Sequence, residues 1–310
     1  MNIIGRRYLY FAISLLVIVP GIIALALWGL PLAIDYTGGS LLTVQFKGGT
    51  TPGTDQVVAL YDSMNIQDSQ VQRSGSDTLI IRSKEINDEE KNKIVAAMAA
   101  KFGGQPIVQE FDQVSPSVGA EVAAHAGEAV AAASVAILLY ITFAFRGVPH
   151  AFRFGTAAII AMLHDVLVVV GTAAIFGKAF GWEVDSLFLT ALLTVIGFSV
   201  HDTIVVFDRI RENANIFRKL PFEGVVNHSI IQTLDRSINT QLTVMMTLAA
   251  LVLFGGLTVR HFVLTLLIGV FSGTYSSIFN ASPILVVWEN REWRYWFKGN
   301  WKKPSTVSAP

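Results

Sequence analysis

The chain has 310 residues, of which 52% are hydrophobic and only 15% are charged, with a formal net charge of zero. Soluble domains contain about 25% charged residues, so much of this chain is expected to face lipid. The zero net charge gives no electrostatic basis for nucleic-acid binding, and we predict none. The lack of cysteine excludes a disulfide framework and a thiolate metal site.

Six segments are apolar enough and long enough to cross a bilayer, which takes about 20 mostly apolar residues. They are 10–30, 129–145, 154–176, 186–207, 238–257 and 262–288. The first follows Arg6 and Arg7 as in a signal peptide, but it exceeds the usual signal-peptide core of about 7–15 residues. We therefore expect an uncleaved first helix and an α-helical membrane protein with six transmembrane helices.

The basic residues predict the orientation. Segments 1–9, 146–153, 208–237 and 288–310 hold 14 of the 23 Lys and Arg residues, whereas the two short loops on the opposite side hold only Lys178 and Arg260. Short loops rich in Lys and Arg stay on the cytoplasmic side. Both termini are therefore expected in the cytoplasm, and the long insert 35–121 is expected outside.

The insert has the pattern of a soluble domain. Strands are predicted at "SLLTVQF", which is followed by Gly48 and Gly49, and at "SQVQRSG", "DTLIIRS" and "QPIVQEFDQV". Helices are predicted at "PGTDQVVALYDSM", with Thr54 as N-cap, and at "NDEEKNKIVAAMAAKFGG", with Asn87 as N-cap. This β-α-β-β-α-β order predicts an α+β ferredoxin-like domain. The expected organisation is 1–34, N-terminus and first helix; 35–121, extracytoplasmic domain; 122–288, helices two to six; and 289–310, cytoplasmic tail.

Two aspartates, Asp165 and Asp202, lie inside apolar spans. An ionised aspartate at the centre of a membrane helix costs about 2.5–3.5 kcal/mol on insertion scales, so such residues tend to carry ions or protons. The alternative is a neutral aspartic acid that joins helices by hydrogen bonds. In either role the side chain is expected to face the protein interior or a hydrated cavity.

A basic and hydroxyl stripe runs along the fifth span. It consists of Arg236, Thr240, Thr243 and Thr247, at helical spacing. Arg236 is the best candidate in this chain for a positive charge that compensates Asp202, although it could instead anchor the helix at the cytoplasmic surface. The threonines could line a hydrated path or pack against another helix.

His164 and His201 each precede one of these aspartates. Metal sites with His-Asp doublets need further ligands, which these spans do not offer, so we predict no metal and expect each histidine to hydrogen-bond its neighbour. Neither a phosphate-binding loop nor a catalytic triad is present as a motif. We expect no enzyme activity and no cofactor, and an ion gradient as the energy source.

Small residues line one face of the last span, at Gly269, Gly273, Ser276 or Ser277, and Asn280. Such a face lets another helix approach closely. We expect it to contact a second membrane subunit.

Five motifs together resemble the SecF family of bacterial protein-export membrane proteins: "AIDYTGGS", "VSPSVGAEV", "LHDVLVV", "VHDTIVVFDRIREN" and "SIIQTLDRSINTQLT". The resemblance covers nearly the whole chain, with the motifs in order. It implies a proton pathway at Asp202 and Arg236, with Asp165 in a less defined role. It also implies a cytoplasmic-end motif at Asp208, Arg209 and Arg211, and an extracytoplasmic motif at Asp35, Gly38 and Gly39. Family members commonly have asparagine where His201 stands.

The resemblance further implies partners and a location. SecF-family chains belong to the resistance–nodulation–division superfamily and form one six-span half of a unit whose other half is SecD. The implied role is to use the proton-motive force, with H⁺ or Na⁺ as the ion, to help pull unfolded preproteins from the SecYEG channel across the bacterial inner membrane. The alternatives are a half-transporter that exports a small molecule or lipid, and a non-transporting scaffold, for which intramembrane charges would be unnecessary.

The predicted orientation can be tested with single cysteines. A cysteine from Ser74→Cys, in the insert, should react with an impermeant maleimide in intact spheroplasts, because the charge pattern places the insert outside. One from Ser305→Cys should react only after lysis. Reversed labelling would contradict both the orientation and the export function that depends on it.

Overall fold

A computed structural model describes residues 2–47, 51–66, 68–147 and 150–292. Gly48, Gly49 and most of the predicted tail, including Ser305, lie outside the described residues. The chain divides into two compact units. One comprises Met1–Leu30, Ala129–Trp182 and Leu187–Pro310, and the other comprises Pro31–Glu128 together with Glu183–Ser186.

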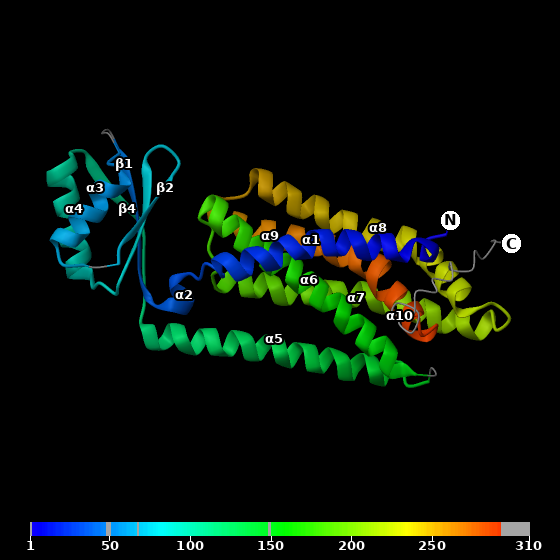
Figure 1. Ribbon diagram of the computed structural model, residues 1–310. Helices are drawn as coiled ribbons and strands as arrows, with labels where there is room; N and C mark the ends of the chain where they lie inside the picture. Colours follow the sequence, from blue (N-terminus) through cyan, green and yellow to red (C-terminus); the bar gives the residue numbers. More distant parts are fainter. Residues whose placement is uncertain (1, 48–50, 67, 148–149, 293–310) are drawn as a thin grey trace. The chain divides into compact units, whose positions relative to one another are not determined.

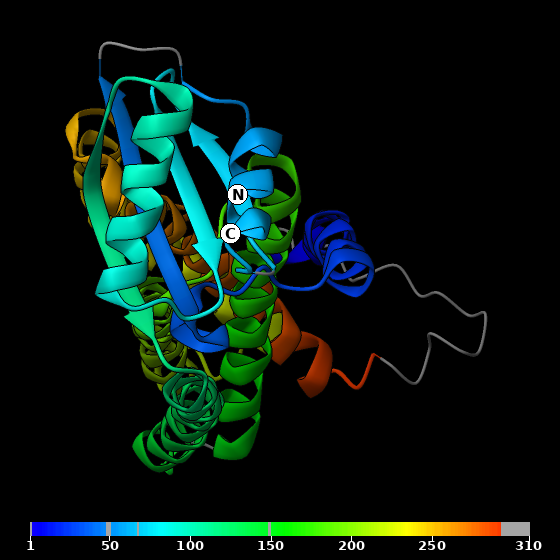
Figure 2. The same cartoon turned by 90° about the vertical axis from the view of Figure 1, so that its left-hand side faces the viewer.

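The smaller unit is an α+β fold on a four-stranded antiparallel sheet with strand order β2-β3-β1-β4 (Figures 1 and 2). Its elements are α2 (Ile34–Thr37), β1 (Gly39–Lys47), α3 (Thr54–Ser63), β2 (Gln70–Ser74), β3 (Thr78–Ser83), α4 (Asp88–Phe102) and β4 (Gln105–Val114). Helices α3 and α4 cover one face of the sheet (Figure 2). The order and pairing confirm the predicted ferredoxin-like fold.

The core of this unit follows from alternation along the strands. On β1, Leu42, Val44 and Phe46 are buried, while the residues between them are less so. Successive strand residues point to opposite faces, so these three side chains share the face that α3 and α4 cover. Tyr61 of α3 and Met98 of α4 pack into the same cluster.

The helix starts in this unit were predicted with mixed success. Asn87 caps α4 as predicted: its side chain accepts a hydrogen bond from Glu90 N at 2.9 Å, and the Glu90 carboxylate accepts one from Asn87 N at 2.9 Å. Thr54, however, is the first helical residue of α3, and Gly53 is the N-cap. The Gln56 side chain accepts a hydrogen bond from Gly53 N at 3.0 Å. This glutamine therefore satisfies a backbone N–H at the start of the helix, where glycine has no side chain to do so.

Among the described residues, six helices are long and apolar enough to cross a membrane, as predicted. They are formed by η1 (Ile4–Arg6) with α1 (Arg7–Trp28), then α5 (Pro116–Ala144), α6 (Ala151–Phe180), α7 (Ser186–Ile216), α8 (Phe222–Phe254), and α9 (Leu257–Ser276) continued by η2 (Ser277–Ala281) and α10 (Ser282–Glu289). Several helices run past the apolar stretches, because polar flanks continue the same backbone hydrogen bonding. The π-helical η2 interrupts the last span.

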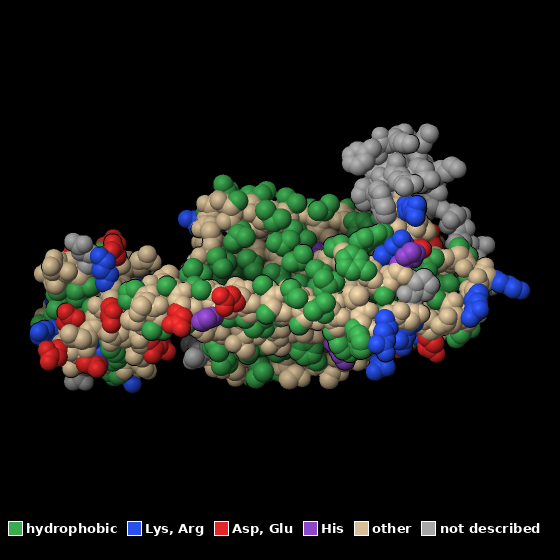
Figure 3. Space-filling view, turned by 90° about the horizontal axis from the view of Figure 1, so that it is seen from below, with side chains coloured by type: hydrophobic (Ala, Val, Ile, Leu, Met, Phe, Trp, Pro, Cys, Tyr) green, Lys and Arg blue, Asp and Glu red, His purple; other side chains and the backbone are tan. Residues whose placement is uncertain are grey.

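The surface of the helical unit matches a lipid environment. Large apolar side chains such as Leu16, Leu139 and Leu253 are exposed, and Figure 3 shows hydrophobic side chains spread over the middle of the helices. Lys and Arg side chains gather towards one end of this unit (Figure 3). This distribution is typical of a membrane-spanning bundle.

Glycine contacts bring two pairs of helices close together. A Cβ added at Gly171 of α6 would lie 2.7 Å from the Cα of Gly21 of α1. A Cβ at Gly269 or Gly273 would meet Val195 or Ser199 of α7, at 2.1 and 3.2 Å. The small face of the last span therefore packs against α7 of the same chain, and the prediction that it contacts a second subunit is wrong.

Arg7 was counted as an orienting surface charge, but it is buried, with 2% of its surface exposed. Its guanidinium lies 3.1 Å from Glu223 of α8 and 2.6 Å from Glu292, which follows α10. Burial opposes ionisation of Glu292, yet hydrogen bonds from Arg7, Tyr8 and Asn290 outweigh it and hold the Glu292 pKa below its ordinary value. These ion pairs join three helices at one end of the unit.

The close approach of α1 and α6 yields a stability prediction. Gly171→Ala places a methyl group against the Gly21 backbone and should destabilise the folded chain by about 1–3 kcal/mol through overpacking. Gly197→Ala on α7 is the control, because nothing lies within 4 Å of its Cβ position. Thermal unfolding in detergent should give a lower Tm for the first variant only. Equal Tm values would show that the two helices can separate freely.

Candidate functional site

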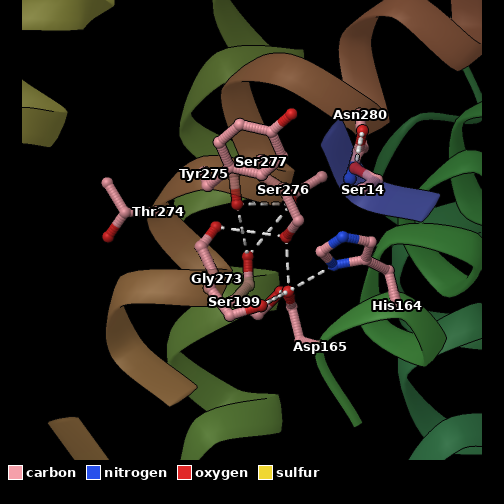
Figure 4. A network of polar contacts seen from close by, with 12 residues as sticks. Ser14, His164, Asp165, Ser199, Gly273, Thr274, Tyr275, Ser276, Ser277 and Asn280 are labelled. Atoms are coloured by element: carbon pink, nitrogen blue, oxygen red, sulfur yellow. Dashed lines mark hydrogen bonds and ion pairs between the residues drawn. The ribbon is translucent and has the colours of Figure 1, made fainter. Parts of the chain in front are cut away.

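A buried carboxylate surrounded by hydroxyl groups occupies the interior of the helical unit (Figure 4). Asp165 of α6 is fully buried. Its Oδ2 accepts hydrogen bonds from Ser199 Oγ of α7 at 2.5 Å and Ser276 Oγ of α9 at 2.6 Å. Its Oδ1 is bonded to Ser272 Oγ at 2.6 Å and His164 Nδ1 at 3.0 Å. Hydrogen bonds of this kind let a carboxylate stay buried inside a membrane protein.

Local helix geometry brings these donors together. Ser272 and Ser276 are four residues apart and so lie on the same face of α9. The next residue, Ser277, begins the π-helical η2 and donates a hydrogen bond to the backbone oxygen of Ser199 at 3.1 Å. Single turns of π-helix are frequent at functional sites.

Asp202 of α7 is also buried, with 4% of its surface exposed, but its surroundings differ. The polar side chains nearest to it are Ser237 and Gln241 of α8. Asp202 Oδ2, Ser237 Oγ and Gln241 Oε1 are all buried, and none has a partner at hydrogen-bond geometry among the described residues. Leaving such groups unpaired costs free energy, and the carboxyl group of Asp202 is less well hydrogen-bonded than that of Asp165.

The structure does not bring Arg236 to Asp202. Arg236 is exposed on α8, and the two side chains form no ion pair in the described part of the chain. Thr240, Thr243 and Thr247 share this exposed face. The residues of α8 that face α7 are those one position further along, including Ser237 and Gln241. Pairing of Asp202 with Arg236 stays a prediction for another arrangement of the helices.

The two histidines occupy different positions. His164 bonds Asp165, as expected from the sequence, and its ring stacks against Tyr275 with centroids 6.2 Å apart. His201 is exposed and, unlike His164, makes no hydrogen bond to the aspartate that follows it among the bonds of the described residues. Among the described residues, no three His, Cys, Asp or Glu side chains are grouped so as to hold a metal ion.

The motif at the end of α7 ties this helix to α8. Asp208 and Arg211 pair with each other at 2.5 Å on the surface. Arg209 donates a hydrogen bond from Nε to Gln232 of α8 at 2.7 Å. The buried Asn213, which sequence reasoning did not single out, donates to the same Gln232 oxygen at 2.8 Å. Arg209 of the motif and Asn213 therefore join α7 to α8 at this end.

The motif of Asp35, Gly38 and Gly39 belongs to the smaller unit. Asp35 Oδ2 accepts a hydrogen bond from Ser186 N at 2.7 Å, at the first residue of α7. Gly38 and Gly39 have φ values of 75° and 119°, which residues other than glycine rarely adopt. This geometry is that of a structural turn.

Tyr36 lies within the same motif. Its burial, with the carboxylates of Asp35 and Asp185 nearby, raises the pKa of its hydroxyl to about 12.

The sequence did not reveal the hydroxyl donors around Asp165. Ser199 lies on α7 and is more than 70 positions away in the sequence from Ser272 and Ser276 on α9. Serine is also common in membrane helices as a packing residue. The only available signal was spacing: Ser272 and Ser276 lie four residues apart on the small face of the last span. That face was assigned to helix contact rather than to a polar site.

Comparison with known proteins agrees with these features. A family model described as "Protein export membrane protein SecD/SecF, C-terminal" matches residues 94–291. The chain is 57% identical to a protein translocase subunit SecF of Anaerolinea thermophila, over 98% of this chain and 99% of the relative. It is 35% identical to protein translocase subunit SecDF of Bacillus subtilis, over 93% of this chain and 38% of that protein.

Solved structures of SecDF share the fold. The crystal structure of SecDF from Thermus thermophilus, described as a translocon-associated membrane protein, matches 94% of this chain with a TM-score of 0.82 and 31% identity. A structure of SecDF in a super-membrane-facing form matches 95% with a TM-score of 0.67. The chain spans 39% of the length of each.

The hydroxyl cage around Asp165 leads to a second stability prediction. Ser276→Ala removes one donor to a buried carboxylate and should cost about 1.5–3 kcal/mol, the range for hydrogen bonds to charged groups. Ser134→Ala on α5 is the control, because that hydroxyl bonds only to its own helix, at Val130 O. Unfolding in detergent should separate the two variants. If Ser276→Ala lowered the free energy of unfolding no more than the control does, the hydroxyl groups around Asp165 would not stabilise the fold.

Proposed function

The chain belongs to the SecD/SecF family of protein-export membrane proteins, and from this we propose that it acts as the SecF subunit of a bacterial Sec translocase. The observation that carries the proposal is the match to SecF of Anaerolinea thermophila along nearly the full length of both chains. We assign it a transport role, with no catalytic residue and no cofactor. We place the chain in the bacterial cytoplasmic membrane, with both termini in the cytoplasm and the sheet domain on the extracytoplasmic side.

We propose a SecD chain as the membrane partner. Two of the compared relatives are SecDF proteins, of which this chain spans less than two fifths. The exposed stripe of Arg236, Thr240, Thr243 and Thr247 supports the proposal, because a charged and hydroxyl-bearing face is costly against lipid. A second six-helix subunit over this face of α8 would shield it and would bring the missing half of the transport unit.

The SecYEG channel and unfolded preproteins are the proposed partners in export. They follow from the function of the family rather than from any surface of this chain. The ferredoxin-like domain would be the part outside the membrane that meets the preprotein. The chain's own contribution to the mechanism lies in its membrane helices.

We propose that Asp202 is the carboxyl that couples an ion gradient, of H⁺ or Na⁺, to movement. Its Oδ2 and two polar atoms that face it from α8 have no hydrogen-bond partner among the described residues, so a change that pairs them would stabilise a different packing of α7 against α8. An ion can drive movement only if it favours one of two conformations. Protonated Asp202 can donate a hydrogen bond to Gln241, whereas ionised Asp202 would attract Arg236 if α8 turns.

The test is preprotein translocation into inverted vesicles that contain the chain with SecD. Asp202→Asn keeps the shape of the side chain but cannot titrate, so the complex should assemble while the uncoupler-sensitive part of translocation is lost. The rate of translocation in this variant should fall to the rate that wild type shows in the presence of uncoupler.

Glu212→Gln is the matched control, because it removes an exposed carboxylate from the same helix, beyond the apolar stretch. It should leave the stimulation intact. Full uncoupler-sensitive stimulation in Asp202→Asn would contradict the coupling role and leave Asp202 as a residue that joins helices.

A further inference from the structure

The imidazole of His164 has one nitrogen in the Asp165 site and one outside it. Nδ1 is 3.0 Å from Asp165 Oδ1, whereas Nε2 is buried and has no hydrogen-bond partner among the described residues. The side chain is nine-tenths buried. A buried polar atom without a partner calls for an explanation, and an unseen water or ion is a common one.

A second unpaired group lies on the same side. Asn280 of η2 is 3% exposed, and its Nδ2 has no partner among the described residues. Its Oδ1 accepts a hydrogen bond from Ser14 Oγ of α1 at 3.0 Å. In Figure 4 the Nε2 edge of the His164 ring points away from Asp165, towards Ser14 and Asn280. The two unpaired nitrogens are chemically complementary: the amide Nδ2 is a donor, and Nε2 is an acceptor when Nδ1 carries the hydrogen.

The Asp165 cage restricts which ion this site can bind. Each carboxylate oxygen is in contact with two hydrogen-bonding groups. An ionised carboxylate has about four acceptor positions, so the cage fills them. A sodium ion would have to displace these donors to reach Asp165. A proton that arrives at Nε2 of His164 would displace none of them.

We propose that His164 is a proton-binding site and that the space between His164 Nε2, Asn280 and Ser14 holds the water that delivers the proton. In the unprotonated state Nδ1–H donates to Asp165 and Nε2 accepts a hydrogen bond from the water. A hydronium ion transfers its proton to Nε2 and becomes water, and the imidazolium then balances the charge of Asp165. The carboxyl keeps its four contacts in both states, so the proton moves on the histidine alone.

The surroundings of His164 contain few other groups that titrate. Asp165 faces it from the same helix, and Tyr275 of α9 stacks on its ring while the Tyr275 hydroxyl donates to Tyr10 O at 2.7 Å. From α1 the nearby groups are the Tyr10 phenol, which interacts with Tyr275, and the Ser14 hydroxyl. From α7 the nearby polar group is the Ser199 hydroxyl. The inference rests on the proposed use of a proton gradient, and it gives this gradient a second site in addition to Asp202.

Nitrogen NMR of the histidine-labelled chain, in complex with SecD in lipid vesicles, tests the proposal directly. His164→Asn identifies the signal by its loss. As the pH is lowered, the His164 ring should change from one protonated nitrogen to two, while the carboxyl carbon of Asp165 stays in its ionised form. In Asn280→Leu, which removes the amide that holds the water, the change at His164 should be lost across the range in which the complex stays folded.

Three results would overturn the proposal: a His164 ring that stays neutral, an Asp165 carboxyl that takes up the proton instead, or a His164 signal that responds to sodium ions at constant pH. An unchanged His164 titration in Asn280→Leu would remove Asn280 from the site.

Export activity separates this inference from the proposed function. His164→Asn places an amide nitrogen near the position of Nδ1, so the bond to Asp165 and the yield of complex on native gels should persist. Uncoupler-sensitive translocation should nevertheless fall to the level that wild type shows with uncoupler, because the amide has no basic nitrogen. If uncoupler-sensitive translocation were retained in His164→Asn but lost in Asp202→Asn, the inference about His164 would be refuted and the proposal for Asp202 would stand. Lack of stimulation in wild type would refute the proposed function.

Discussion

A carboxylate inside a bilayer persists only where the protein supplies the hydrogen bonds and charges that water would otherwise give it. Asp165 meets this requirement through donors on α6, α7 and α9, so three helices must keep fixed positions around one side chain. The close contact of Gly273 with Ser199 lets α9 approach α7 at this site, and the turn of π-helix follows directly after Ser276.

Asp202 shows the other outcome of the same constraint. It is almost as buried as Asp165, but its oxygen and the side chains facing it from α8 lack partners. Both oxygens of Asp165 accept hydrogen bonds across the interface of α6, α7 and α9. The interface of α7 and α8 leaves three polar atoms without a partner at hydrogen-bond geometry among the described residues. We propose that movement driven by the ion takes place at this second interface.

The sequence was sufficient for features that depend on local pattern. Hydropathy located the six spans, strand alternation and turn residues gave the sheet domain, and Asn87 was identified as a cap from its neighbours. It was insufficient where side chains distant in sequence meet. Ser199 and Ser276 donate hydrogen bonds to Asp165 only once α7 and α9 pack together. The spacing of Gly273 could not show which helix it would contact. A helical wheel placed Arg236 on a polar stripe, but it could not tell that this stripe points away from Asp202.

We propose that Asp202 is the carboxyl that changes its protonation state in this protein. Infrared difference spectroscopy of the complex in membranes, recorded across an acid step, measures this change as a carboxylic-acid stretching band. The band should disappear in Asp202→Asn and persist in Asp165→Asn. A band that survives in Asp202→Asn, or one that is lost only in Asp165→Asn, would contradict the account.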